Sequence, residues 1–158
     1  MAEDKKAVAI MHQFKTLVDQ RSNWESHWQQ LADFISPRKA DITKKRTSGD
    51  KRTELVFDGT AIHAAEMLAA SLHGMLTNPS TPWFSLKFKD RELDGDDEAK
   101  EWLEGVTDVM YAAINRSNFA EAVHELYSDL VVFGTGVMSI EKDEESDLRF
   151  STRHIAEC

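Results

Sequence analysis

The sequence contains a single cysteine, Cys158, so no disulfide can form within the chain. One thiol in a chain of this length is typical of a protein from a reducing compartment. Only three prolines occur, all within residues 37–82, so we expect helices on either side of that region. The N-terminus MAEDKKAVAI lacks the apolar core of a secretory signal. The longest uncharged run, residues 67–86, contains two prolines, so we expect no membrane helix.

Positive charge is also scarce, because 19 basic residues face 28 acidic ones and leave a net charge of -9. Phosphate attraction needs a positive field, so non-specific nucleic-acid binding over the whole surface is disfavoured. Residues 38–54 differ, because seven basic and three acidic residues give this segment a local net charge of +4. We interpret it as a basic loop that either is simply solvated or contacts DNA or protein. Its basic residues are Arg38, Lys39, Lys44, Lys45, Arg46, Lys51 and Arg52.

Motifs for catalysis or metal binding are missing as well. No GxSxG, HExxH, CxxC or Walker-type phosphate loop occurs. His63, Glu66 and His73 share one face of an expected helix. However, His63 and His73 are ten residues apart, or about 15 Å along a helix, and one metal ion cannot bridge that distance. The sequence therefore predicts no enzyme, with no catalytic residue, cofactor or metal site.

The N-terminal segment carries a regular apolar pattern. Apolar or amphipathic residues alternate in steps of three and four, which predicts a helix over about 5–35. The positions are Ala7, Ile10, Phe14, Leu17, Arg21, Trp24, Trp28, Leu31 and Ile35. Ser22-Asn-Trp-Glu25 is typical of a capping box, so this element is expected to be one long helix or a helix pair. Pro37 ends it.

The remaining pattern predicts three further helices, a short strand and a C-terminal β-hairpin. Together these define a predominantly α-helical α+β fold. The expected helices cover about 59–76, 97–115 and 119–133, and the expected strands cover about 83–88, 136–142 and 148–154. Asp58 or Thr60 is expected to cap the first of these helices. A capping box of Asn118 and Glu121 opens the last one, and Gly134 ends it.

Tryptophan positions give a further expectation about the core. Trp24, Trp28 and Trp102 fall on apolar helical stripes, where packing in the core is the best interpretation. Trp83 and Phe84 follow a proline-containing linker, and we consider them a candidate docking surface.

Several short motifs, taken in order along the chain, resemble those of the head-to-tail connector (portal) proteins of short-tailed, podovirus-type bacteriophages. The resemblance runs from about residue 20 to Ile155. The motifs are Arg21-x-x-Trp24-Glu25, Ala-Asp-Phe-Ile-Ser-Pro37, Phe57-Asp-Gly-Thr60-Ala, Asn78-Pro-x-x-Pro-Trp83-Phe84, and Ser117-Asn-Phe119 followed by Val132-Phe-Gly-Thr-Gly136.

The resemblance implies a structural subunit of a ring, dodecameric in the virion, at one vertex of the capsid. DNA is packaged and ejected through the channel of such a ring. The implied partners are other copies of the subunit, the major capsid protein, a scaffolding protein, the terminase large subunit, a tail adaptor and double-stranded DNA. No membrane is involved, and the implied location is the virion, with the host cytoplasm during assembly.

Portal subunits are several times longer than this chain, and the resemblance covers their N-terminal part. Residues 1–158 are accordingly expected to form a single wing-like region, without matches to the clip, the stem or the tunnel loop. We expect monomers or small irregular oligomers from this segment alone and discrete rings from a full-length subunit. The alternative is a helical nucleic-acid-binding module that uses residues 38–52, and an enzyme with an unrecognised site is a more distant one.

Overall fold

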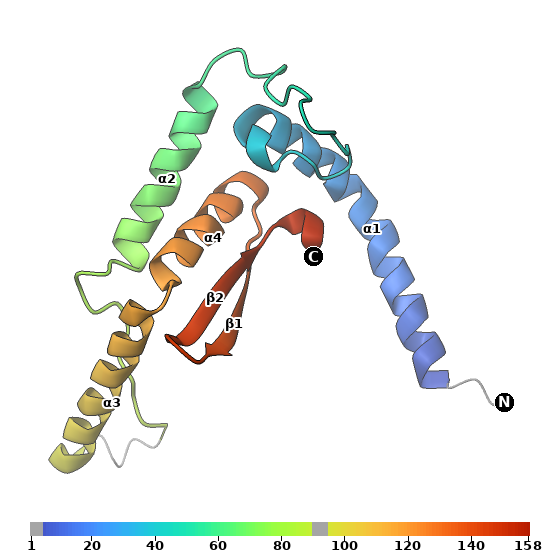
Figure 1. Cartoon of the computed structure of the whole chain (residues 1–158). Coiled ribbons are helices and arrows are strands. Elements are labelled where there is room, and N and C mark those ends of the chain that lie inside the picture. Colours follow the sequence, from blue (N-terminus) through green and yellow to red (C-terminus); the bar gives the residue numbers. More distant parts are fainter. Residues whose placement is uncertain (1–4, 90–94) are drawn as a thin grey trace. The chain divides into compact units, whose positions relative to one another are not determined.

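The computed structural model describes residues 5–89 and 95–158, and it divides into two compact units, Met1–Ile62 and His63–Cys158. The predominantly helical α+β fold is confirmed, and the helix and hairpin bounds lie close to the predicted ones (Figure 1). The elements are α1 (Lys5–Ile35), the 3-10 turn η1 (Pro37–Lys39), α2 (Thr60–Leu76), α3 (Asp97–Arg116), α4 (Phe119–Phe133), β1 (Val137–Asp143), β2 (Asp147–Arg153) and the 3-10 turn η3 (Ile155–Glu157).

In the first unit, α1 runs as one continuous helix. The capping box predicted at Ser22 is wrong, because the Ser22 hydroxyl donates to the backbone carbonyl of Asp19, 2.9 Å away, within the same helix. A serine that bonds to the preceding turn can stay inside a helix. The helix ends just before Pro37, as predicted.

Burial along α1 is confined to its C-terminal part. Trp28, Gln29, Ala32 and Asp33 are buried, whereas every residue from 5 to 20 is exposed. The predicted core position of Trp28 is confirmed, and that of Trp24 is wrong, because Trp24 is exposed. Helical periodicity identifies an apolar face, but only a second element packed on that face can bury it.

The second unit is built around α4, which lies between α2 and the β-hairpin (Figure 1). Ala69 of α2 packs against Val123 and Tyr127 of α4, and its small side chain lets the two helices approach closely. The surrounding partly buried residues are Leu72, Phe119, Leu126 and Val131. The Asp58 carboxylate accepts the backbone N–H of Thr60 at 2.9 Å, which confirms one of the two predicted caps for α2.

The connection from α4 to the hairpin depends on two glycines. Gly134 ends α4 with a φ of 73°, in the left-handed region that glycine adopts without strain, as predicted for a helix stop. A Cβ atom added to Gly136 would lie 2.6 Å from Leu126 Cδ1 and 3.0 Å from the Leu126 carbonyl oxygen, so a larger residue would require Leu126 or the start of β1 to shift. β1 and β2 then pair antiparallel, from Val137 opposite Arg153 to Asp143 opposite Asp147.

The side chain of Asn118 joins the start of α4 to β2. Its amide nitrogen donates to the Phe150 carbonyl at 2.7 Å, and its oxygen accepts the Phe150 N–H at 2.8 Å. The predicted capping box is therefore wrong, because the amide pairs with a strand and makes no capping hydrogen bond. Thr152 adds a second link by donating to the Ala122 carbonyl at 2.6 Å.

The strand predicted over 83–88 is absent from the described residues, and this prediction is wrong. An alternating pattern makes a strand only where a partner strand pairs with its backbone. Here the Tyr111 hydroxyl takes that place: it accepts the Phe84 N–H at 2.6 Å and donates to the Phe84 carbonyl at 2.7 Å.

The outer face of α3 also differs from the prediction. Trp102 is 63% exposed, and its ring contact among the described residues is with Phe88 of the same unit, at a ring distance of 6.3 Å. Leu103, the next residue, is the one that α3 buries. The predicted core position of Trp102 is therefore wrong.

Candidate functional site

The seven predicted basic residues all lie in or beside the loop that follows α1, and Gln29 of α1 organises the loop. The Gln29 side-chain oxygen accepts the backbone N–H groups of Ile42, Thr43 and Lys44 at distances of 3.2, 2.8 and 3.2 Å. Its amide nitrogen donates to the Ala40 carbonyl at 2.6 Å. Gln29 itself is only 3% exposed, so one buried amide wraps residues 40–44 around the end of α1.

Asp33, one helical turn after Gln29, neutralises part of the basic charge. Its carboxylate lies 2.7 Å from Arg46 Nη2 and 2.9 Å from Lys44 Nζ, and it accepts the Gln29 amide at 3.0 Å. Arg46 also donates to the Ala40 carbonyl at 2.7 Å. A buried charge needs partners of this kind, since an unpaired carboxylate would be strongly disfavoured there.

The rest of the loop is held by further pairs. Arg52 lies 2.6 Å from the Asp41 carboxylate, and Arg46 lies 3.3 Å from the same group. A turn spans residues 47–50, in which the Thr47 N–H and hydroxyl both donate to the Asp50 carboxylate, at 2.7 and 2.9 Å. The positive field that a nucleic-acid site needs is therefore partly cancelled inside the loop.

The four remaining predicted basic residues differ in exposure. Arg38, Lys45 and Lys51 are exposed, and Lys39 is half-buried. The other three basic residues form ion pairs within the first unit: Lys44 and Arg46 with Asp33, and Arg46 and Arg52 with Asp41. Contact of this loop with DNA or with protein stays a prediction.

The environment of Asp33 predicts how the loop responds to acid. Burial by itself would raise the pKa of Asp33, but hydrogen bonds from Arg46, Lys44 and Gln29 outweigh it and lower the pKa below its usual value. A carboxylate with a lowered folded pKa stabilises the fold above its unfolded pKa of about 3.9, and this contribution is lost as pH falls through the folded pKa. We therefore expect the first unit to lose stability below about pH 4.

Urea unfolding at a series of pH values between neutral and strongly acidic measures this effect. Asp33→Asn should be less stable at neutral pH and should lose less stability on acidification than the unmodified chain. Asp50 and Asp58, whose pKa values are lowered by hydrogen bonds from Thr47 and Thr60, keep a residual pH dependence in the variant. Parallel pH profiles for the two proteins would contradict the role given to Asp33.

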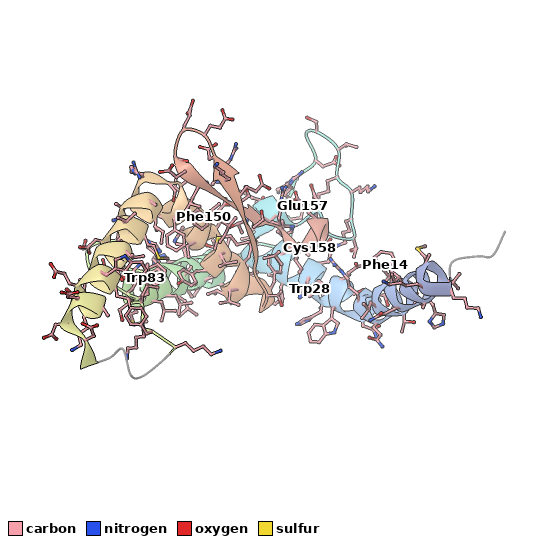
Figure 2. The ribbon with its side chains drawn as sticks, turned by 90° about the horizontal axis from the view of Figure 1, so that it is seen from below. Phe14, Trp28, Trp83, Phe150, Glu157 and Cys158 are labelled. Carbon is pink, nitrogen blue, oxygen red and sulfur yellow. The ribbon has the colours of Figure 1, made fainter. Side chains whose placement is uncertain are left out.

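The second predicted surface, Trp83 and Phe84, lies within an aromatic cluster of its own unit. Trp83, labelled in Figure 2, stacks on Phe119 with ring centroids 5.7 Å apart and an interplanar angle of 7°, and Phe84 stacks on Tyr111 at 4.3 Å. Phe119 in turn meets Phe150 edge-on at 5.0 Å. Trp83 keeps 38% of its surface exposed, so its use in docking stays a prediction, while its packing role is evident.

A groove of about 580 Å³ runs beside this cluster, between residues 82–88 and α3. Phe84, Leu86 and Phe88 line one wall, and Leu103 and Tyr111 lie on the other. The lining also includes Lys87, Lys100, Glu104 and Asp108, so the groove combines apolar walls with charged side chains.

Sequence reasoning missed Gln29, Asp33, Tyr111 and Asn118 as the residues that organise these surfaces. One signal was available for the first pair: two polar residues four apart share one face at the end of an amphipathic helix, directly before a basic loop. Tyr111 and Asn118 carry no such signal, because their partners lie 27 and 32 residues away.

Within residues 5–89 and 95–158, no group of three or more His, Cys, Asp or Glu side chains is arranged to hold a metal ion. His63, Glu66 and His73 are thus not brought together as ligands. In the same part of the chain, no helix has the length and apolar character needed to cross a membrane.

Comparison with known proteins identifies the protein family to which the chain belongs. The sequence matches the family described as "Bacteriophage head to tail connecting protein" over residues 7–158, and the chain belongs to this family. It is similar to the "Probable portal protein" of Bordetella phage BPP-1, with 34% identity over 136 residues that cover 85% of this chain and 24% of the relative. It is also similar to the "Portal protein" of Salmonella phage epsilon15, with 33% identity over 150 residues that cover 94% of this chain and 27% of the relative. The chain spans about a quarter of the length of these curated relatives.

Proposed function

We propose that this chain forms part of a phage portal subunit, a structural protein that joins head to tail at one vertex of the capsid. The observation that carries the proposal is the family match, which extends over residues 7–158 and so includes both compact units. Two relatives at about one-third identity bear the name of portal protein, and this supports the same role.

In this role the subunits form a ring whose channel passes double-stranded DNA during packaging and ejection. The partners are other copies of the subunit, the major capsid protein, the scaffolding protein, the terminase large subunit and a tail adaptor. The subunit resides in the virion and, before assembly, in the host cytoplasm. Its contribution is structural, without catalysis of its own.

The structure favours this proposal over a module dedicated to nucleic acid. Three of the seven basic residues in the predicted contact loop pair with carboxylates of the same unit, namely Lys44, Arg46 and Arg52. A dedicated nucleic-acid site would leave such charges facing outward to neutralise phosphates. The loop is better described as a structural clasp around the end of α1.

Antibody labelling of virions tests the proposed role directly. Antibodies raised against the 158-residue chain should mark a single vertex of the phage particles that carry this protein, as seen by electron microscopy, after the capsid is opened or the tail removed. A control serum against the major capsid protein should mark the whole shell. Label spread over the shell, or confined to the distal tail, would contradict the proposal.

A further inference from the structure

The N-terminal half of α1 presents an apolar face that the described residues leave uncovered. All residues from 5 to 20 are exposed, and Phe14 is 62% exposed although it lies in the middle of the apolar pattern. Figure 2 shows Phe14 on a part of α1 beside which no other described segment of Met1–Ile62 lies. Most apolar side chains of this half lie on one side of the helix, namely Ala7, Ile10, Met11, Phe14, Leu17 and Val18, whereas Val8 and Ala9 lie outside this set.

These side chains form one band with basic edges, which we call the α1 band. At 100° per residue they occupy a sector of about 120° on the helix. Lys6 borders the sector next to Leu17, and Lys15 borders it next to Met11 and Val18 on the other side. Residues 5–20 carry three lysines and a single acidic residue, Asp19. The α1 band is thus apolar along its centre and positive along both edges.

A second row of apolar residues on α3 is partly uncovered, with Val106 and Ala113 half-buried, and it has the opposite charge. Trp102, Val106, Val109 and Ala113 recur in steps of four, three and four, which places them on one face; we call them the α3 row. Val109 is 68% exposed, as is most of Trp102. Glu101 and Asp108 lie along one side of the α3 row, and α3 as a whole carries five acidic and two basic residues.

Charge decides which of these surfaces can pair. Two α1 bands facing each other would bring lysines together, and two α3 rows would bring carboxylates together; both arrangements are disfavoured. A band against a row joins apolar centres and places lysine opposite carboxylate along one edge. Steps of three and four residues on both helices also suit the packing of one helix along another.

We propose that the α1 band of one copy of this chain packs on the α3 row of a second copy. This inference rests on the proposed function as a ring subunit. Because the two surfaces differ, each copy can offer its α1 band to one neighbour and its α3 row to the other. A head-to-tail contact of this type generates a ring when its rotation closes.

Cross-linking between single-cysteine chains tests the contact. In a Cys158→Ser background, Met11→Cys marks the α1 band and Val109→Cys marks the α3 row. Ala9→Cys, on the opposite side of α1, is the matched control. Tagged and untagged chains are mixed and treated with a short bismaleimide, which tolerates a small shift in register, and the linked peptides are identified by mass spectrometry.

Met11→Cys mixed with Val109→Cys should give at least about tenfold more mixed product than Ala9→Cys mixed with Val109→Cys, because only the first pair lies in the contact. The mixed product should also exceed both products that link identical chains. A majority of identical-chain products, or equal yields for the Met11 and Ala9 positions, would overturn the proposal.

Charge reversal separates a contact between copies from one within a copy. We expect Lys15→Glu chains to cross-link poorly with one another, and Glu101→Lys/Asp108→Lys chains likewise, whereas a mixture of the two should recover the yield. Recovery only when all three substitutions share one chain would place the contact inside a single copy and overturn the proposal. Antibodies could still label a single vertex of the virions in that case. The proposed function and the proposed contact between copies can therefore fail independently of each other.

Discussion

Replacing Gln29 with alanine should destabilise the first unit by about 2–4 kcal/mol. The side chain is almost wholly buried, and its oxygen is the acceptor for three consecutive backbone N–H groups and for the Thr43 hydroxyl. Alanine leaves these donors without their protein partner, whereas the Ala40 carbonyl keeps the hydrogen bond from Arg46. Each buried group left unsatisfied costs roughly 1–3 kcal/mol, and water that reaches the half-exposed loop limits the sum.

Hydrogen exchange of the backbone amides localises this effect. The amides of residues 42–44 should exchange faster in Gln29→Ala, together with amides near the C-terminal end of α1. Gln30→Ala is the matched control, because Gln30 is the same residue type at the next position and is exposed. Equal protection of residues 42–44 in the two variants would show that Gln29 does not hold the loop.

A second variant separates hydrogen bonding from volume. Gln29→Glu keeps the size and the acceptor oxygen, but it places a carboxylate where the amide nitrogen now lies, 3.0 Å from the Asp33 oxygen. Two carboxylates at this distance repel each other and cannot both stay ionised without cost. Gln29→Glu should therefore be at least as unstable as Gln29→Ala near neutral pH, whereas a role in filling space alone would leave it close to the unmodified chain.

Local patterns predicted the secondary structure of this chain well. The bounds of α1 and α4 follow from apolar spacing, from Pro37 and from Gly134, all of which act within one or two turns. The hairpin could be predicted equally well, because two alternating segments flank a short polar loop. The wrong strand at 83–88 shows the limit: alternation describes a segment, but pairing requires a partner that lies elsewhere in the chain.

The interaction surfaces were harder to predict from the sequence, for the same physical reason. Periodicity placed Trp24, Trp28 and Trp102 on apolar faces correctly, yet only Trp28 has an element packed over it. The contacts that Gln29 and Asp33 make depend on loop residues 40–46, and no rule of sequence spacing predicts the path of these residues. Asn118 looked like a cap because its sequence context is local, whereas its amide bonds to Phe150.

In the second unit, we expect alanine substitutions of Trp83 and Trp102 to lower the stability by clearly different amounts. Trp83→Ala should destabilise this unit by about 2–3 kcal/mol, below the usual 3–5 kcal/mol for a buried aromatic residue because the ring is partly exposed. The substitution removes stacking on Phe119 and edge contacts with Phe84 and Tyr111, at ring distances of 5.7, 4.8 and 6.4 Å. Trp102→Ala removes one ring contact, with Phe88, and should cost less than about 1 kcal/mol.

Urea unfolding, followed by near-ultraviolet circular dichroism at low protein concentration, measures both variants against the unmodified chain. Similar losses for the two tryptophans would contradict the packing role given to Trp83. The cross-linking yield between Met11→Cys and Val109→Cys chains should respond in the opposite way. It should fall when Trp102→Ala is added to the Val109→Cys chain, because Trp102 belongs to the α3 row. One tryptophan then stabilises the subunit, whereas the other, which lies on an apolar helical stripe, stabilises the contact between subunits.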